Sequence, residues 1–304
     1  MTEVAAEAPS PEAAWRAGRL SARSGSRKLL FGRVYEDSAI ELQAFPAGER
    51  VFCIASAGCT ALALCRDHDV VACDINPAQI EYVRRRLSGG GREVGSAERV
   101  MGFMRRLMPL AGWSRASVNR FLTLSNPEEQ LLQWQRELDN WRFRSGFALL
   151  LSPLWLRSVY SSALLSCLPE RFDQVLRGRM QRCFGLHPNR SNPFARALLL
   201  GISEEQHVED DGARIELVVG DAAEYLERCP RESFGGLSLS NILDGADDAY
   251  RERLFAAVRH AAKPGANIVW RSFSEPSPGL LTNQADDDRS MLWGIVDVRP
   301  VESL

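Results

Sequence analysis

The sequence predicts an α/β protein whose doubly wound, mostly parallel sheet is interrupted by a long helical segment. Residues 50–87 read as a strand, a small-residue turn, a helix, a second strand and a second helix. Residues 92–201 show helical periodicity with almost no strand signal, and the α/β pattern resumes at residue 214. Alternating strands and helices are typical of nucleotide-binding sheets of the Rossmann type.

The first βαβ unit is legible residue by residue. The run RVFCIA at residues 50–55 is apolar and rich in strand-forming side chains, and residues 60–66 continue as a helix. Residues 70–73 form the next apolar run. Asn76 is placed to cap a helix that takes Pro77 in its first turn and extends to about residue 87.

The second half of the sheet is predicted from the same alternation. The expected strands are residues 215–219, 234–239, 267–272 and 291–298, and the expected helices are residues 223–228 and 248–262. Lys263, Pro264 and Gly265 are expected to stop the second of these helices. The final strand is expected to run antiparallel to its neighbour.

Four segments follow from these elements. Residues 1–28 are rich in Ala, Pro, Ser and Arg and are expected to be flexible. Residues 29–91 and 202–304 are the two halves of the α/β domain, and residues 92–201 are a helical insertion expected to cover the sheet edge as an acceptor cap. The insertion begins in a basic stretch, with nine Arg between Arg84 and Arg120 against Glu93 and Glu98.

The apolar stretch at residues 147–168 has to be weighed against a membrane span. Pro153, Arg157 and several serines interrupt it. These favour a buried helix pair over a span, with a peripheral membrane contact as the alternative. The N-terminus lacks the basic start and apolar run of a signal peptide, which predicts a cytoplasmic protein.

Composition excludes some functions. Lys and Arg number 37 and Asp and Glu number 39, which gives a net charge of −2. The protein therefore has no overall positive potential that would attract nucleic acid. The seven cysteines and four histidines show no metal-ligand spacing, and no metal is expected. The expected partner is a small molecule or a lipid.

Polar or small residues occur where four of the expected strands end. In such sheets the ligand lies outside the carboxyl ends of the strands. The predicted contacts are the turn Ser56, Ala57 and Gly58, the acid Asp74 with Ile75 for a ribose, Asp221 with Ala222 for an adenine amino group, and Ser240 with Asn241 under the reactive part. The turn S-A-G-C-T-A lacks two of the three glycines of a dinucleotide fingerprint. S-adenosylmethionine, which carries no phosphate, fits this turn better than NAD does.

Several motifs together resemble a known family. The segments VYED at residues 34–37, IASAGC at 54–59, DINPAQ at 74–79, NPF at 192–194, LSNI at 239–242 and DRS at 288–290 carry the resemblance. It is to the S-adenosylmethionine-dependent 3-amino-3-carboxypropyltransferases, in particular the diacylglycerol transferases of betaine-lipid synthesis. The resemblance implies a class I methyltransferase-like fold. It covers residues 30–298, which is nearly all of the chain that is expected to be ordered.

The implied reaction transfers the 3-amino-3-carboxypropyl group of S-adenosylmethionine to a hydroxyl or phenol oxygen and releases methylthioadenosine. Family relatives of about this length alkylate a phenol in nocardicin antibiotic synthesis, so the acceptor is expected to be such a phenol or a diacylglycerol-like lipid. Glu36 and Asp37 are expected to hold the ammonium of the transferred arm. Arg289, with Arg33 and Arg271 as alternatives, is expected to hold its carboxylate.

An oxygen acceptor must lose its proton, and three residues are candidate bases. Tyr35, His187 and Asp244 are named for this role, and the sequence does not rank them. Two other functions stay open: an ordinary S-adenosylmethionine-dependent methyltransferase, and a non-catalytic protein that binds S-adenosylmethionine.

Overall fold

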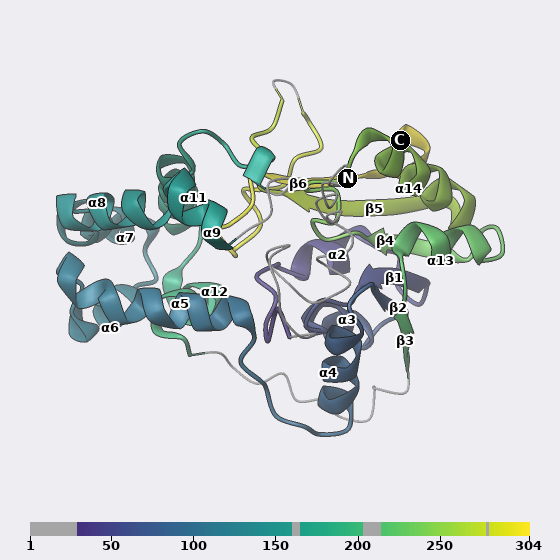
Figure 1. Cartoon of the computed structure of the whole chain (residues 1–304), viewed down its shortest axis with the longest axis horizontal. Coiled ribbons are helices and arrows are strands. Elements are labelled where there is room, and N and C mark those ends of the chain that lie inside the picture. Colours follow the sequence, from purple (N-terminus) through teal and green to yellow (C-terminus); the bar gives the residue numbers. More distant parts are fainter. Residues whose placement is uncertain (1–28, 160–164, 203–213, 278–279) are drawn as a thin grey trace, which may run out of the picture.

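The computed structural model describes residues 29–159, 165–202, 214–277 and 280–304 (Figure 1). The segment expected to be flexible, residues 1–28, lies outside the described residues. One sheet contains β1 (Arg50–Ile54), β2 (Asp69–Asp74), β3 (Ile215–Val219), β4 (Phe234–Ser238), β5 (Ala262–Ser272) and β6 (Ile295–Pro300). The helices of the insertion, from Ser96 to Leu200, form a lobe at one side of this sheet (Figure 1).

The six strands lie in the order β3-β2-β1-β4-β5-β6. The pairs from β3 to β5 are all parallel, and β6 pairs antiparallel with β5 from Asn267 opposite Pro300 to Ser272 opposite Ile295. The expected orientation of the last strand is therefore confirmed. The chain builds outward from β1 to β3 and then returns to the other side of β1 with β4, so the order reverses between β1 and β4.

Helices cover both faces of the sheet. They are α2 (Ala39–Ala44), α3 (Cys59–Leu64), α4 (Pro77–Leu87), α13 (Ala222–Arg228) and α14 (Asp248–Ala261). Alternate residues of β1 serve the two faces, since Phe52 packs in the cluster of α13 and α14 and Val51 packs in the cluster of α3. The side chain of Asn76 caps α4 by accepting the Ala78 N–H at 2.9 Å, as expected.

The insertion is helical, as the sequence predicts. Its helices are α5 (Ser96–Leu107), α6 (Arg115–Leu122), α7 (Pro127–Gln133), a π-turn (Trp134–Leu138), α8 (Trp141–Leu150), α9 (Pro153–Val159), α11 (Phe172–Leu186) and α12 (Pro193–Leu200). The lobe has its own aromatic core, in which the rings of Trp113 and Trp134 lie 5.9 Å apart and those of Phe121 and Phe184 4.8 Å apart.

Two boundaries differ from the expectation. β5 begins at Ala262, directly after α14, so Pro264 and its neighbours belong to a strand and not to a turn. β6 begins at Ile295 and not at Met291. The preceding residues turn toward other partners, because the Trp293 ring N–H donates to the Tyr35 carbonyl and the Arg179 guanidinium donates to the Leu292 carbonyl.

The apolar stretch at residues 147–168 also differs from the buried helix pair that the sequence predicts. Within the described residues no helix combines the length and the apolar character that crossing a bilayer requires. The stretch is divided between α8 and α9, and the expected burial of that pair is wrong for Leu149 and Leu154, which are 73% and 84% exposed. Leu156 of α9 is buried, so this helix presents one side to the lobe and another, with Leu154, to the surface.

Candidate functional site

A pocket of about 580 Å³ lies outside the carboxyl ends of β1 to β4. Strand-end residues form most of its floor, namely Ile54, Ser56, Cys73, Asp74, Ile75, Gly220, Asp221, Ala222, Ser240 and Asn241. The structure therefore brings together the four strand ends that the sequence singled out. This is the position at which sheets of this order hold their ligands, and the volume lies in the usual range for small-molecule sites.

The backbone is unusual at both central strand ends. Ser56 and Ser240 adopt left-handed conformations with φ of 43° and 51°, which cost a non-glycine residue of order 1 kcal/mol. Neighbouring groups hold both residues. The Gln79 amide donates to the Ser56 carbonyl at 2.6 Å, and the Arg271 N–H donates to the Ser240 carbonyl at 2.7 Å. Held in this shape, the two turns flank the point where the strand order reverses.

Asp74 ends β2 beside the Ser56 turn, and both of its carboxylate oxygens are engaged. Its Oδ2 accepts the Ser56 N–H at 2.9 Å and its Oδ1 accepts the Asn76 N–H at 2.8 Å. Burial raises the pKa of Asp74 to about 7, although the two backbone donors act in the opposite direction. Each oxygen keeps a further lone pair, so the carboxylate can still accept two hydroxyls of a ribose.

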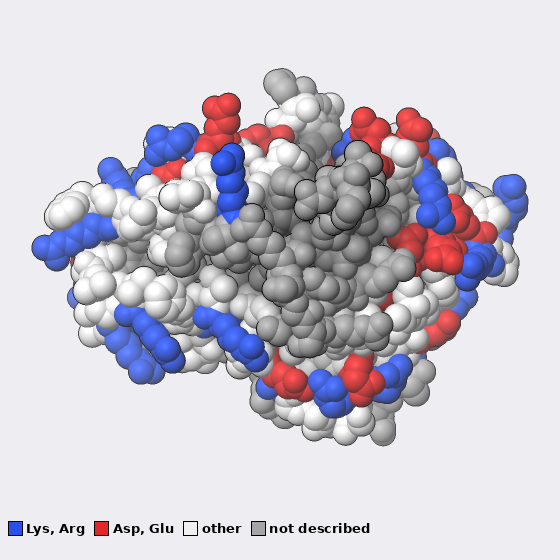
Figure 2. Space-filling model, in the orientation of Figure 1, with Lys and Arg blue, Asp and Glu red and all other residues white. Residues whose placement is uncertain are grey.

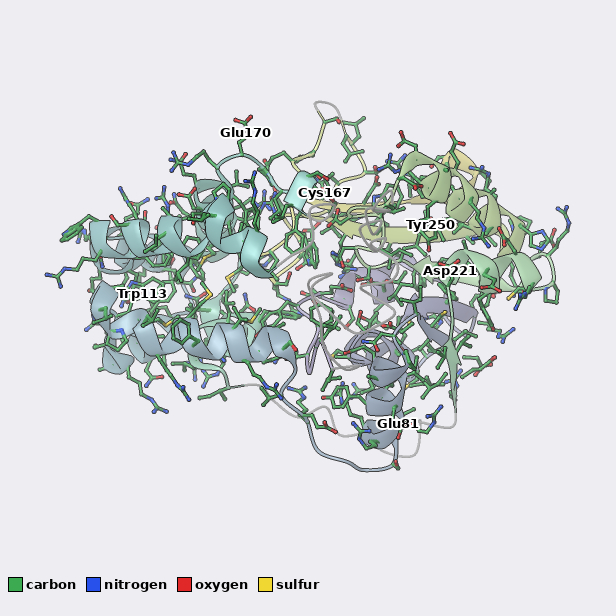
Figure 3. The ribbon with its side chains drawn as sticks, viewed as in Figure 1. Glu81, Trp113, Cys167, Glu170, Asp221 and Tyr250 are labelled. Carbon is green, nitrogen blue, oxygen red and sulfur yellow. The ribbon has the colours of Figure 1, made fainter. Side chains whose placement is uncertain are left out.

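Asp221 has two roles in this wall. Its Oδ1 caps α13 by accepting the Glu224 N–H at 2.9 Å, and its Oδ2 accepts the Tyr250 hydroxyl at 2.7 Å. Figure 3 shows Tyr250 of α14 beside Asp221, with Cys167 on the side of the helical lobe. Sequence reasoning missed Tyr250. Its signal is indirect: Asp247 caps α14 just after the β4 end, which places the first turn of α14 at the pocket.

Asp244 is the candidate base that lines the pocket. Its carboxylate accepts the Ser272 hydroxyl at 2.5 Å, the Phe273 N–H at 3.1 Å and the Asn241 amide at 3.3 Å. Burial raises the pKa of Asp244 above its ordinary value, although these donors oppose the shift. A carboxylate with a raised pKa is a better proton acceptor near neutral pH.

The charged side chains that line the described part of the pocket all have one sign. Asp74, Asp221, Asp244 and Asp247 line it, and among the described lining residues there is no Lys, Arg or His. A concave site lined by one sign of charge focuses its potential inward. The pocket therefore favours a cationic ligand and disfavours a phosphate-bearing one.

A buried charge cluster adds to this potential. The Arg271 side chain is fully buried and donates to Glu41 at 2.5 and 3.1 Å and to Asp288 at 3.2 Å, with Glu36 at 3.8 Å. Three carboxylates thus face one guanidinium. Burial raises the pKa of Glu36 to about 7, and the Ser240 hydroxyl donates to Glu36. Glu36 does not line the pocket, but it contacts the β4 end from behind.

The predicted arm-binding pair requires a correction. Asp37 and Arg289 bind each other: Nη2 of Arg289 lies 2.8 Å from Oδ1, and Nε donates to Oδ2. Burial of Asp37 opposes ionisation, but the Arg289 guanidinium holds the pKa of Asp37 below its ordinary value. Neither side chain lines the pocket. The Asp37 carboxylate and the Arg289 guanidinium, predicted to bind the ammonium and the carboxylate of the arm, form an ion pair with each other instead.

Two predicted bases also lie elsewhere. The side chain of Tyr35 lines a second cavity, beneath the insertion. His187 follows the last turn of α11, and its Nε2 lies 2.7 Å from the Asp286 carbonyl oxygen. His187 does not line the pocket, so its catalytic role stays a prediction that this position does not support.

Ala57 and Gly58, the other two residues of the Ser56 turn, do not line the pocket. Ala57 is fully buried. Gly58 has φ of 80°, and a Cβ at this position would lie 2.9 Å from Cγ1 of Val83. Both residues are small because the turn packs closely on α4, which corrects their prediction as ligand contacts.

Gln79 and Cys167 are site residues that sequence reasoning did not name. The Gln79 Oε1 accepts the Leu30 N–H at 2.7 Å, which fixes the segment that closes one side of the pocket. The Gly245 N–H donates to Sγ of Cys167 at 2.9 Å. Among the described residues of the insertion, only Ser166 and Cys167 line the pocket.

Comparisons with known proteins add no name: no family model matches the chain, and no curated protein matches it. Over the described part of the chain, no group of three or more His, Cys, Asp or Glu is placed to hold a metal ion. The chemistry of the pocket is therefore the basis for assigning a function.

Proposed function

We propose that the chain binds S-adenosylmethionine in the acidic pocket and transfers its 3-amino-3-carboxypropyl group to a hydroxyl or phenol oxygen. The observation that carries the proposal is the pocket at the β1 to β4 ends, lined by four Asp and, among the described residues, by no basic side chain. S-adenosylmethionine is a nucleoside with a cationic sulfonium. The sheet order is compatible with a class I methyltransferase-like fold.

The residues present fit such a ligand. Asp74 can accept the ribose hydroxyls, and the Tyr250 and Asp221 pair lies where an adenine would be held. Asp247 is available for the ammonium of the methionyl arm. A dinucleotide would bring two phosphates into the same negative potential, which supports a sulfonium nucleoside over NAD.

Asp244 is the base that this proposal requires. The acceptor oxygen would bond to the γ-carbon as the carbon–sulfur bond breaks, and methylthioadenosine would leave. The proton of the acceptor then has to pass to a neighbouring group. A phenol has a pKa of about 10, so a carboxylate of raised pKa gives useful help. The acceptor remains a nocardicin-type phenol or a diacylglycerol-like lipid in this proposal.

One observation favours a second candidate, a methyltransferase. Moving the γ-carbon and not the methyl group to the acceptor requires a firm hold on the methionyl carboxylate. The predicted partner, Arg289, is bound to Asp37, and the described lining offers no other cation. Methyl transfer would leave the arm as a passive part of the ligand.

Product analysis separates these functions. Protein, S-adenosylmethionine and a panel of phenols and diacylglycerols are incubated, and the by-product and the mass gain of the acceptor are measured. Methylthioadenosine with an aminocarboxypropyl adduct supports the proposal, and S-adenosylhomocysteine with a methyl adduct supports the methyltransferase. Ligand binding with no turnover on any acceptor identifies a non-catalytic protein.

A variant pair tests the base. Asp244→Asn should lower turnover about 100-fold or more while binding of S-adenosylmethionine changes little. Asp248→Asn is the matched control, because Asp248 opens α14 close by but does not line the pocket. Equal turnover in the two variants would remove Asp244 from the mechanism.

A further inference from the structure

A second cavity, of about 530 Å³, lies between the segment before β1 and the insertion. The segment contributes Gly32, Arg33 and Tyr35, and α5 contributes most of the opposite wall. The end of α12 closes one side with Ala197 and Gly201. Nothing in the proposed transferase function uses this cavity, so it needs an explanation of its own.

The cavity is basic. Its lining includes five arginines, Arg33, Arg92, Arg99, Arg105 and Arg106. Among the described residues that line it, two carboxylates, Glu93 and Glu98, accompany them. Figure 2 shows basic side chains along the α5 and α6 side of the helical lobe, whereas acidic and basic side chains are interspersed around α13 and α14. Four arginines of the basic stretch found in the sequence, Arg92, Arg99, Arg105 and Arg106, thus line one cavity.

Both carboxylates are committed to other partners. Glu93 binds Arg85, which lies outside the cavity, at 2.6 Å. Glu98 accepts three backbone N–H groups at 2.9, 3.1 and 2.9 Å, from Gly32, Arg33 and Gly95. No ion pair joins either Glu to a lining arginine among the described contacts. Arg99, Arg105 and Arg106 of α5 thus line the cavity without an ion pair to Glu93 or Glu98 among the described contacts, and the described lining carries more basic than acidic side chains.

Two of the guanidinium groups are held in place. Arg105 donates to the Ala197 and Leu198 carbonyls at 3.4 and 3.3 Å, at the end of α12. Gly201 makes room for it, since a Cβ there would lie 3.0 Å from Nε of Arg105. The Arg33 guanidinium lies 5.7 Å from the ring centre of Tyr35. Positions set by packing in this way lose little entropy when an anion binds.

The cavity also has an aromatic side. The buried Tyr35 contributes its ring and hydroxyl, and the half-exposed Phe103 contributes a second ring. Burial raises the pKa of the Tyr35 hydroxyl, although Arg33 and Arg105 oppose this, so the hydroxyl remains a donor at neutral pH. A bare phosphate would use only a small part of the volume.

We infer that this cavity binds an organic phosphate monoester, with the phosphate among the arginines and an apolar or aromatic portion against Tyr35 and Phe103. A dianionic phosphate matches several guanidinium groups better than a single carboxylate does. The charge of the cavity is opposite to that of the first pocket, so the two sites select different ligands. The inference does not depend on the identity of the ligand in the first pocket.

Calorimetric titration of the full chain with phenyl phosphate tests this inference. The double variant Arg99→Gln/Arg106→Gln removes two exposed charges from the cavity, and we expect a loss of affinity of about tenfold or more. The matched control is Arg115→Gln/Arg136→Gln, which removes two exposed charges from the same lobe outside the cavity. Affinity for S-adenosylmethionine should be unchanged in both.

Three results would overturn the inference: no binding of phenyl phosphate, equal weakening in the two double variants, or equal affinity for benzoate and phenyl phosphate. A second arm identifies the source of the phosphate. Phosphatidylcholine vesicles with and without phosphatidic acid are sedimented with the protein. Retention that phenyl phosphate displaces identifies a lipid headgroup, and phenyl phosphate binding without retention identifies a small soluble ester.

Discussion

The acidic pocket and the basic cavity lie on opposite sides of one short segment. Leu30 and Phe31 line the pocket at the sheet edge, and Arg33 and Tyr35 line the cavity under the insertion. One site presents Asp side chains from strand ends and the other presents Arg side chains from a helix. Because the two volumes are similar and the charged lining residues opposite in sign, we expect electrostatics, more than size, to separate the ligands proposed for the two sites.

The shared wall is held by polar side chains from two helices. Gln79 of α4 binds Leu30, the Tyr82 hydroxyl donates to the Gly32 carbonyl at 2.9 Å, and Glu98 of α5 accepts the Arg33 N–H. Asp37, bound to Arg289, fixes the far end. A wall fixed at both ends allows each site to be tested separately.

The largest expected effect is at Asp74. Asp74→Ala should weaken S-adenosylmethionine binding by roughly 2–4 kcal/mol, because it removes charge-assisted hydrogen bonds to the ligand and the anchor of the Ser56 turn. Calorimetry measures the loss. Asp69→Ala, at the exposed opposite end of β2, is the control. Binding of phenyl phosphate should not change; a parallel loss at both sites would mean that the wall, and not the ligand contact, had been damaged.

The next effect concerns the wall itself. Arg289→Ala leaves the buried Asp37 carboxylate without its partner, so the free energy of unfolding should fall by roughly 2–3 kcal/mol in a urea titration. Both ligands should then lose affinity by similar factors. A selective loss of S-adenosylmethionine turnover, with methylthioadenosine binding retained, would instead return Arg289 to the arm-binding role that the sequence predicts.

The pH dependence should distinguish the two sites. Since the pKa of Asp74 is raised to about 7, its ionised fraction rises about tenfold between pH 6 and 8, and affinity for S-adenosylmethionine should rise with it. The unliganded protein should become less stable as pH rises from about 4 to 7, because the folded state holds protons on Asp74 and Glu36 that the unfolded state has released. Asp74→Asn should flatten the affinity profile. A steep profile in that variant would assign the titration to another group.

The smallest effect is expected at Tyr250. Tyr250→Phe removes the hydroxyl that donates to Asp221 and should weaken binding of methylthioadenosine by about 1 kcal/mol. Tyr225→Phe is the control, since Tyr225 contacts Glu216 and lies outside the pocket. Equal affinities for the two variants would show that Asp221 serves mainly as the cap of α13.

Much of the sheet could be predicted because its signals are local. Apolar runs, the Asn76 cap and the position of Asp74 are readable within a few residues, and parallel strands bring their carboxyl ends to one edge. Ser240 and Asp244 line the pocket for the same reason. The position of the pocket could therefore be predicted from the residues at the strand ends.

What depended on tertiary contacts could not be predicted. The sequence places His187 late in the insertion, which predicted a position near the pocket. The helical lobe stands beside the sheet (Figure 1), and His187 contacts the Asp286 carbonyl instead. Tyr35 and Glu36 are adjacent in the chain, yet they face different surroundings because the segment is extended. The sequence predicts Asp37 and Arg289 as contacts of the methionyl arm. Only the fold shows that the two side chains bind each other.

The single sign of charge in the first pocket has a kinetic consequence under the proposed function. A sulfonium arrives as a cation, and the field of the four Asp should speed its capture, with an association rate that falls as salt is added. Alkyl transfer turns the sulfonium into a neutral thioether. The same carboxylates then attract the spent nucleoside less than the incoming one, so the reaction itself loosens its by-product and favours the next turnover.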